Sequence, residues 1–207
     1  MDTRPFHVVF LVGSIGVGKR TAAKIMSDTV AIRPVVIDAF EFELRERCHA
    51  AYKLFDRQRL PVPANQFDAD LDTPSKYFEG KSPRTAYAAF TKFVHENMGR
   101  DAMGRWLVDR VKFFRQLQAE RLKPSDCARG MIIFDTAPQA AYERVVEYAG
   151  VENCTQVVIK RDGAVSIPVS IPGRVAEVKN TGETVAGLEL AIRRAVPWLF
   201  IEVAKKI

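Results

Sequence analysis

The chain has 207 residues and a formal net charge of +6, with 47% hydrophobic and 27% charged residues. This length and composition are typical of a globular protein with one core domain, or a core domain and an insertion, and no repeat or low-complexity segment interrupts it. No apolar run approaches the roughly 20 residues of a membrane helix, and no hydrophobic signal region stands at the N-terminus. We therefore expect a cytoplasmic protein with no membrane association.

The cysteines, histidines and basic residues predict no disulfide framework, zinc site or stable nucleic-acid complex. Cys48, Cys127 and Cys154 show no paired spacing, and the three histidines lie far apart in the sequence. The pI near 9.3 suits either nucleic acid or an enzyme that binds two polyanionic nucleotides. Because the positive residues are scattered, without a run of about five or six like charges, the enzyme is the favoured interpretation.

The first predicted elements are a strand and a helix joined by a glycine-rich loop. The apolar run 8–12 predicts a buried strand, and the pattern of Ala22, Ala23, Ile25 and Met26 predicts a helix over about 18–27. Between them the chain reads Gly13-Ser14-Ile15-Gly16-Val17-Gly18-Lys19-Arg20-Thr21. Backbone N–H groups of such a loop, together with the start of the following helix, favour phosphate binding. Lys19 is expected to reach the outer phosphates, and a hydroxyl is expected beside Mg²⁺.

The next segments predict a second strand, a helix and a long loop. Residues 35–38 form a short buried-strand pattern that ends at Asp38, and a helical stripe runs from Phe40 to Phe55 with charges on its other face. Residues 57–81 contain prolines and a polar, acidic stretch without helical or strand period, which predicts a long loop. Its carboxylates, Asp68, Asp70 and Asp72, are expected to be solvated, because the glycine and terminal glutamate of a calcium loop are missing.

Two helices are predicted next. Ser82 and Pro83 form a helix start, and Gly99 ends the stripe of that helix. A second helix follows from about Asp101 and fades before Lys123-Pro124. Three arginines lie in this helical pair: Arg84, Arg105 and Arg110.

The remaining chain alternates strands and helices. Residues 130–135 predict a strand that ends at Asp135, 138–148 a helix, 156–159 and 174–178 two further strands, and 185–196 a last helix. Strands that are nearly continuous apolar runs indicate a five-stranded parallel sheet with helices on both faces, a three-layer α/β/α fold. Ligands then bind beyond the carboxyl ends of the strands, where the glycine loop, Asp38 and Asp135 would share one edge.

The glycine loop follows the pattern G-x-x-G-x-G-K-x-T at Gly13, Gly16, Gly18, Lys19 and Thr21. This pattern resembles the loop of nucleoside monophosphate kinases. Four further segments support a resemblance over nearly the whole chain: Pro83-Arg84, Gly99-Arg100-Asp101 with Trp106-Leu107-Val108, Phe134-Asp135 with Pro138-Gln139, and Val178-Lys179-Asn180-Thr181-Gly182. With these segments, the chain resembles the deoxynucleoside monophosphate kinases of large DNA bacteriophages, a branch of the P-loop kinase fold.

This resemblance implies transfer of the γ-phosphoryl group of ATP to a deoxynucleoside 5′-monophosphate. It implies one kinase domain over 1–207, with 39–122 as an acceptor-binding insertion and 161–173 as a short lid-like loop. Relatives form homodimers, and a phage source would place the protein in the host cytoplasm. The implied ATP-binding residues are Gly13, Ser14, Gly16, Val17, Gly18, Lys19, Arg20, Thr21 and Asn180; the acceptor-binding residues are Asp38, Phe40, Arg84 and Arg105; the Mg²⁺-binding residues are Thr21 and Asp135; and the catalytic cations are Lys19, Arg105 and Arg161.

One departure from the family and three other functions stay open. Relatives usually carry arginines in a lid between the fourth and fifth strands, but 164–173 holds none, and only Arg161 and Arg174 flank it. The alternatives are another small P-loop kinase, acting for instance on a coenzyme precursor, a nucleotide-dependent nucleic-acid-binding ATPase, and an inactive scaffold. Motor ATPases usually place a glutamate after the third-strand aspartate, whereas Asp135 is followed by Thr136.

Overall fold

The computed structural model describes residues 6–14, 16–30, 35–38, 40–55, 62–63, 65–99, 101–121, 130–134, 139–163 and 173–200. The chain divides into two compact units. The sheet unit comprises 1–38 and 104–207, and the smaller unit comprises 39–103. The predicted insertion, 39–122, begins at the same residue as the smaller unit and runs on through a helix that belongs mostly to the sheet unit.

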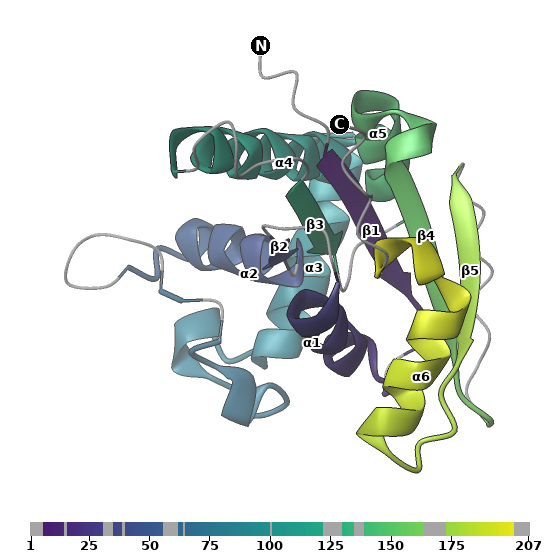
Figure 1. The fold of residues 1–207 in the computed structure, drawn as a ribbon. Helices are drawn as coiled ribbons and strands as arrows, with labels where there is room; N and C mark the ends of the chain where they lie inside the picture. Colours follow the sequence, from purple (N-terminus) through teal and green to yellow (C-terminus); the bar gives the residue numbers. More distant parts are fainter. Residues whose placement is uncertain are drawn as a thin grey trace. The chain divides into compact units, whose positions relative to one another are not determined.

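The sheet unit is built on a five-stranded, all-parallel sheet (Figure 1), as predicted. Its strand order is β2-β3-β1-β4-β5, so β1 lies in the centre, where Phe10 is in register with Phe134 on one side and Gln156 on the other. Every residue of β3 is buried, which explains why this strand is a continuous apolar run. The strands are β1 (Phe6–Val12), β2 (Val35–Asp38), β3 (Gly130–Phe134), β4 (Cys154–Lys160) and β5 (Arg174–Lys179).

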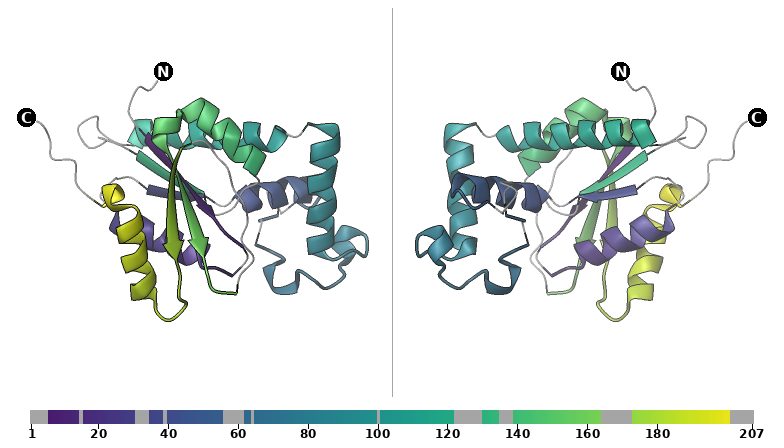
Figure 2. Two further views of the ribbon diagram at one scale, coloured as in Figure 1. Left: turned by 90° about the vertical axis from the view of Figure 1, so that its right-hand side faces the viewer. Right: turned by 90° about the vertical axis from the view of Figure 1, so that its left-hand side faces the viewer.

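Helices cover both faces of this sheet, as the two views in Figure 2 show. On one face, α1 (Lys19–Thr29) and α6 (Val185–Ala195) pack against alternate strand residues, and their buried side chains form one apolar core with Val9, Leu11 and Ile133. On the other face lie α4 (Ala102–Arg121) and α5 (Gln139–Ala149), where the ring of Tyr142 lies 4.3 Å from that of Phe10. The layered α/β arrangement predicted from the strand runs is therefore present in this unit.

The smaller unit has its own core between α2 (Phe40–Ala51) and α3 (Pro83–Asn97). Ser82 accepts a hydrogen bond from the Thr85 N–H, and this cap starts α3 with Pro83 in its first turn, as predicted. Among the described residues, this unit also contains the short 3-10 helices η1 (Asp68–Asp70) and η2 (Lys76–Phe78), and the sheet unit contains η3 (Val151–Asn153) and η4 (Pro197–Leu199).

Two expectations for the smaller unit are wrong. Residues 65–81 do not form a plain long loop, because η1 and η2 lie there and Phe78 is fully buried in the core of the unit. The stripe expected to reach Phe55 ends earlier, since α2 stops at Ala51 and Phe55 is 48% exposed. On the charged face of α2, Arg45 is only 6% exposed.

The connections that follow β1 and β3 leave the carboxyl edge of the sheet on opposite faces. The connection after β1 runs through α1 on one face, and the connection after β3 runs through α5 on the other. Chain segments therefore leave neighbouring strands in opposite directions, which is the usual place of a ligand site in a parallel sheet. Among the described helices, none has the length and apolar character needed to span a bilayer.

Candidate functional site

The glycine loop, residues 13–18, follows the carboxyl end of β1 and is packed against the end of β4. Gly13 has φ +152°, and a Cβ there would lie 2.6 Å from the carbonyl oxygen of Ile159 and 2.8 Å from Cγ2 of Val17. A larger residue would meet backbone that cannot move aside, so glycine is required by the close approach. Gly16 and Gly18 also have positive φ, +82° and +98°, which is the conformation that glycine adopts at least cost.

Lys19 lies at the junction of this loop and α1. Its ammonium donates hydrogen bonds to the carbonyl oxygens of Gly13 and Ser14, both at 2.8 Å. The side chain therefore folds back over the start of the loop. Ser14 Oγ is also buried here, and it has no hydrogen-bond partner in the described structure.

The start of α1 is suited to an anion. The helix begins at Lys19 after Gly18, which provides no side-chain cap, and the first turn contains no acidic residue. The N–H groups at the start of a helix have no partner within the helix, and the helix dipole makes this end positive. Arg20 and Thr21 are exposed in this turn.

Asn180 joins the turn after β5 to the glycine loop. Its side-chain Nδ2 donates to the carbonyl oxygen of Val17 at 2.7 Å, and its Oδ1 accepts a hydrogen bond from the Gly182 N–H at 2.9 Å. Its backbone N–H donates to the backbone carbonyl oxygen of Lys160, at the end of β4. Asn180 is 8% exposed, so its amide serves mainly contacts inside the protein.

Arg161, the first residue after β4, lies next to the same loop. Its Nη1 is 3.5 Å from the carbonyl oxygen of Gly16, and a Cβ on Gly182 would lie 2.7 Å from its Nη2. The side chain is exposed. The structure thus brings together eight residues predicted for the nucleotide site, all in the sheet unit: Gly13, Ser14, Gly16, Val17, Gly18, Lys19, Arg161 and Asn180.

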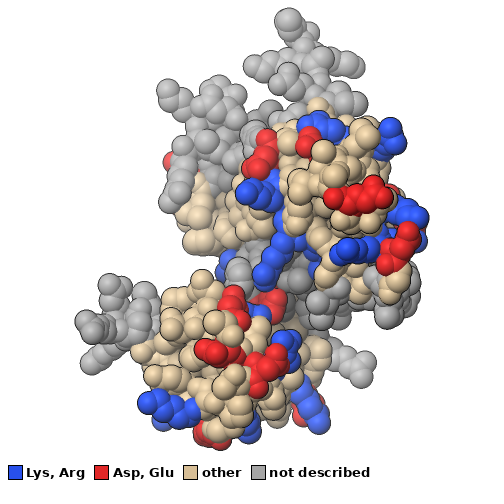
Figure 3. All heavy atoms as spheres, turned by 90° about the horizontal axis from the view of Figure 1, so that it is seen from below, with Lys and Arg blue, Asp and Glu red and all other residues tan. Residues whose placement is uncertain are grey.

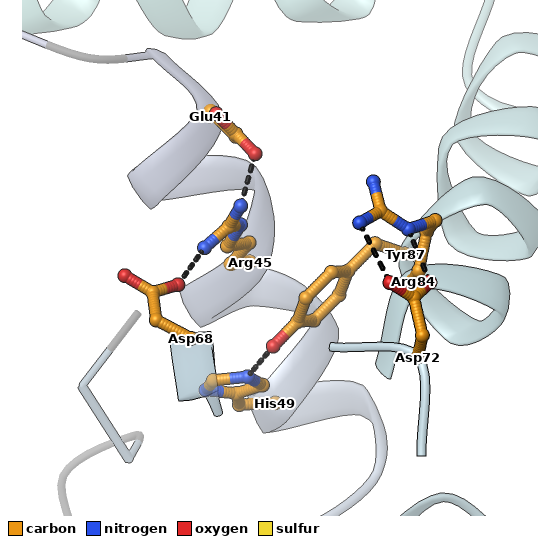
Figure 4. Close-up of polar contacts among 7 residues, drawn as sticks. All are labelled: Glu41, Arg45, His49, Asp68, Asp72, Arg84 and Tyr87. Carbon is orange, nitrogen blue, oxygen red and sulfur yellow. Dashed lines mark hydrogen bonds and ion pairs between the residues drawn. The ribbon is translucent and has the colours of Figure 1, made fainter. Parts of the chain in front are cut away.

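In the smaller unit, Arg84 is held by a carboxylate (Figure 4). Its Nε and Nη2 donate to the two oxygens of Asp72 at 2.6 and 3.1 Å. This hydrogen bond is the main cause that raises the pKa of Arg84 and lowers the pKa of Asp72. Asp72 is exposed, as expected of a solvated carboxylate, and its ion pair with Arg84 was not predicted from the sequence.

Arg45 forms a second ion-paired arginine in this unit, which sequence reasoning missed (Figure 4). Its guanidinium donates to Glu41, one turn earlier in α2, and to Asp68 of η1. It also lies 5.2 Å from the centre of the Tyr87 ring. The spacing of Glu41 and Arg45 by four residues was the one signal in the sequence, while Asp68 is too far along the chain to be connected by periodicity.

A buried polar pair lies beside Arg45. His49 is fully buried, and its Nδ1 is 2.7 Å from the carbonyl oxygen of Val62 while its Nε2 is 2.8 Å from the hydroxyl of Tyr87. Because a carbonyl can only accept, Nδ1 carries the proton and Nε2 accepts from Tyr87. Burial lowers the pKa of His49, and the charge of Arg45 lowers it further, against the Val62 hydrogen bond.

The site residues predicted outside the glycine loop and its neighbours are only partly described. Asp135 lies outside the described residues, as do 164–172 of the predicted lid-like loop. Asp38 ends β2 and Phe40 begins α2, but their side chains also lie outside what is described. Arg105 is exposed on α4. Within the described ranges, no three His, Cys, Asp or Glu side chains gather where they could hold a metal ion.

The chain was also compared with known proteins. No protein-family model matches it, and no curated protein does either.

Proposed function

We propose that this chain is a P-loop kinase that transfers the γ-phosphoryl group of ATP to a deoxynucleoside 5′-monophosphate. The observation that carries the proposal is the lysine-bearing glycine loop at the carboxyl end of the central strand. There the Lys19 ammonium, an uncapped helix start and the buried Ser14 hydroxyl converge. Each of the three is a partner for a phosphate oxygen.

The residues of the loop fit the triphosphate of ATP. Lys19 now satisfies two backbone carbonyls, and phosphate oxygens with full negative charge are stronger acceptors for the same ammonium. Thr21, exposed in the first turn of α1, would bind Mg²⁺ together with water molecules, and Asp135 would hold that water shell. Magnesium bound in this way neutralises charge on the phosphates.

The chain's own contribution to the transfer is positioning and charge. Arg161, beside the carbonyl of Gly16, would neutralise charge that develops on the transferred group. Arg105 stays a second candidate for this role. Arg84 would bind the phosphate of the acceptor, because its planar fork already engages a carboxylate at two points, the geometry that it would use with phosphate. Asp38 and Phe40 are proposed for the sugar or base of the acceptor.

The proposal is tested by binding and by product formation. Calorimetry should register binding of Mg·ATP to the unmodified chain, and a panel of nucleoside monophosphates incubated with ATP should yield ADP and a phosphorylated deoxynucleotide. Lys19→Ala should abolish turnover, a loss of at least about a hundredfold, because it removes the charge that contacts the transferred group. Lys24→Ala is the matched control, since Lys24 is an exposed lysine of the same helix.

Other outcomes would favour the rival functions. Phosphorylation of a different small acceptor, with no deoxynucleotide phosphorylated, would move the assignment to another small kinase. Hydrolysis of ATP that nucleic acid stimulates, without a phosphorylated product, would favour a nucleic-acid-binding ATPase. On the face shown in Figure 3, basic and acidic side chains are mixed. Among the described residues, Lys160 of β4 pairs with Glu177 and Arg193 of α6 pairs with Glu189. A mixed face supports the kinase over a nucleic-acid surface.

A further inference from the structure

We propose that Asn180 is a positioning residue of the phosphate site. Asn180 orients the glycine loop through the carbonyl of Val17 and does not bind the nucleoside. The resemblance to nucleotide kinases assigns Asn180 to the bound nucleotide itself. Its contacts point to a different role, which rests on the proposed function of the loop in binding a triphosphate.

The Asn180 amide is committed to the protein at both ends. The Nδ2 group donates to Val17, and Oδ1 accepts from the Gly182 N–H, with the residue 8% exposed. One N–H of Nδ2 and one lone pair of Oδ1 remain, but because the residue is only 8% exposed they offer a nucleoside little access.

The hydrogen bond to Val17 determines where the next N–H group points. A peptide unit is planar and trans, so the carbonyl of Val17 and the N–H of Gly18 point in opposite directions. Because Asn180 holds the carbonyl on its own side, the Gly18 N–H is directed away from Asn180. One residue earlier, the Gly16 carbonyl lies 3.5 Å from Nη1 of Arg161, and the Val17 N–H of the same peptide unit points the opposite way. Consecutive N–H groups directed to one side are what binds an anion in such loops.

The glycines of the loop and turn make room for this arrangement. A Cβ on Gly18 would lie 2.7 Å from Nδ2 of Asn180, and a Cβ on Gly182 would lie 2.7 Å from Nη2 of Arg161. Glycine at position 18 therefore admits the amide, and glycine at position 182 admits the guanidinium. Through its bond to the Gly182 N–H, Asn180 also holds the turn against which Arg161 lies.

The test compares ATP with a ligand that has no nucleoside. Dissociation constants for Mg·ATP and for magnesium tripolyphosphate should be measured on the unmodified chain, Asn180→Ala and Asn180→Asp. Asn180→Asp keeps an acceptor for Gly182 but replaces the donor to Val17 by a carboxylate oxygen. In each variant, the dissociation constants for Mg·ATP and for magnesium tripolyphosphate should rise by the same factor, about tenfold, which is the effect of losing one hydrogen bond that orients a charged-ligand site.

Two control variants separate positioning from general loss of stability. Thr181→Ala changes an exposed residue of the same turn and should leave both affinities unchanged. Ile192→Val removes one methyl group from the fully buried core of α6 and lowers stability without touching the loop, so it too should leave both affinities unchanged.

Three results would overturn the role of Asn180. Weaker binding of ATP with unchanged binding of tripolyphosphate would mean that the amide contacts the nucleoside. Unchanged affinity for both ligands would mean that the amide does not orient the loop, and equal weakening by Ile192→Val would mean that the effect is one of stability. Failure of the unmodified chain to bind either ligand would instead remove the proposed function, and this inference with it.

Discussion

Asp72 would compete with an acceptor phosphate for the guanidinium of Arg84. Asp72 accepts two hydrogen bonds from it, and the pair holds both groups in their charged forms, since the pKa of Asp72 is lowered and the pKa of Arg84 is raised. The side chains are 61% and 75% exposed, so water and salt weaken their attraction. A phosphate with more charge than a carboxylate can therefore displace Asp72 from the same fork.

Arg84→Ala tests this residue as the acceptor-binding group. We expect the KM for the monophosphate to rise about tenfold or more, since a two-point arginine–phosphate contact is lost, while the KM for ATP changes little. Steady-state kinetics with each substrate varied in turn would measure the difference. Equal losses for both substrates would contradict the acceptor role.

Two further variants make this comparison sharper. Arg47→Ala removes another ion-paired arginine of the smaller unit and should change neither KM. Asp72→Asn removes the competing charge and should lower the KM for the monophosphate, an effect opposite in sign to that of Arg84→Ala. A rise in that KM in Asp72→Asn would mean that the pair must stay intact for acceptor binding.

At the scale of the element, two positions of the glycine loop require glycine for different reasons. Gly13 has both a positive φ and a crowded Cβ position against Ile159, whereas a Cβ on Gly16 would find no atom within 4 Å. Gly16 therefore needs glycine for its backbone angle alone. Comparing alanine substitutions at Gly13 and Gly16 therefore separates the free-energy cost of the backbone angle from that of the crowded Cβ position.

Gly13→Ala should destabilise the chain more than Gly16→Ala does. An alanine at positive φ costs about 1–2 kcal/mol, which is the loss expected for Gly16→Ala. Gly13→Ala adds overpacking against a backbone carbonyl, typically a further loss of about 1–3 kcal/mol. The free energy of unfolding in urea, with unchanged m-value, measures both. Equal losses at the two positions would show that the end of β4 yields to the added methyl group.

The elements themselves could be predicted where a local pattern determines them. Buried parallel strands are continuous apolar runs, and Ser82-Pro83 starts a helix by chemistry that acts within one turn. Arg45 could not be predicted as buried, because its partners Asp68 and Tyr87 are brought to it only by the folded smaller unit. Within the site, the loop was visible in the sequence, whereas the contacts of Asn180 depend on a turn that follows the last strand.

At the scale of the whole molecule, the two units have separate cores with different chemistry. The sheet unit has an apolar cluster built from side chains of β1, β3, β4, β5, α1 and α6, and the polar side chains that β4 buries, Thr155 and Gln156, are not ionisable. The smaller unit buries the ionisable His49 beside the aromatic rings of Phe67, Phe78 and Tyr87. Its stability is therefore expected to depend on pH through this histidine.

The sign of this dependence follows from the pKa of His49. Burial, with a further contribution from Arg45, lowers the pKa in the folded unit below the ordinary value of 6.5. As pH falls below 6.5, the unfolded chain takes up a proton before the folded one does, so acid favours unfolding. The stabilisation is present above pH 6.5 and is lost as pH falls toward the folded-state pKa. The slope can reach about 1.4 kcal/mol per pH unit for this one group.

His49→Gln should remove this slope, because glutamine does not titrate and still offers a donor and an acceptor to Val62 and Tyr87. Urea unfolding followed by circular dichroism at pH 7.5, 6.5 and 5.5 would compare it with the unmodified chain. His95→Gln, at an exposed position of α3, is the matched control and should keep the full dependence. The same slope in His49→Gln as in the unmodified chain would assign acid sensitivity to other groups and leave His49 with a packing role alone.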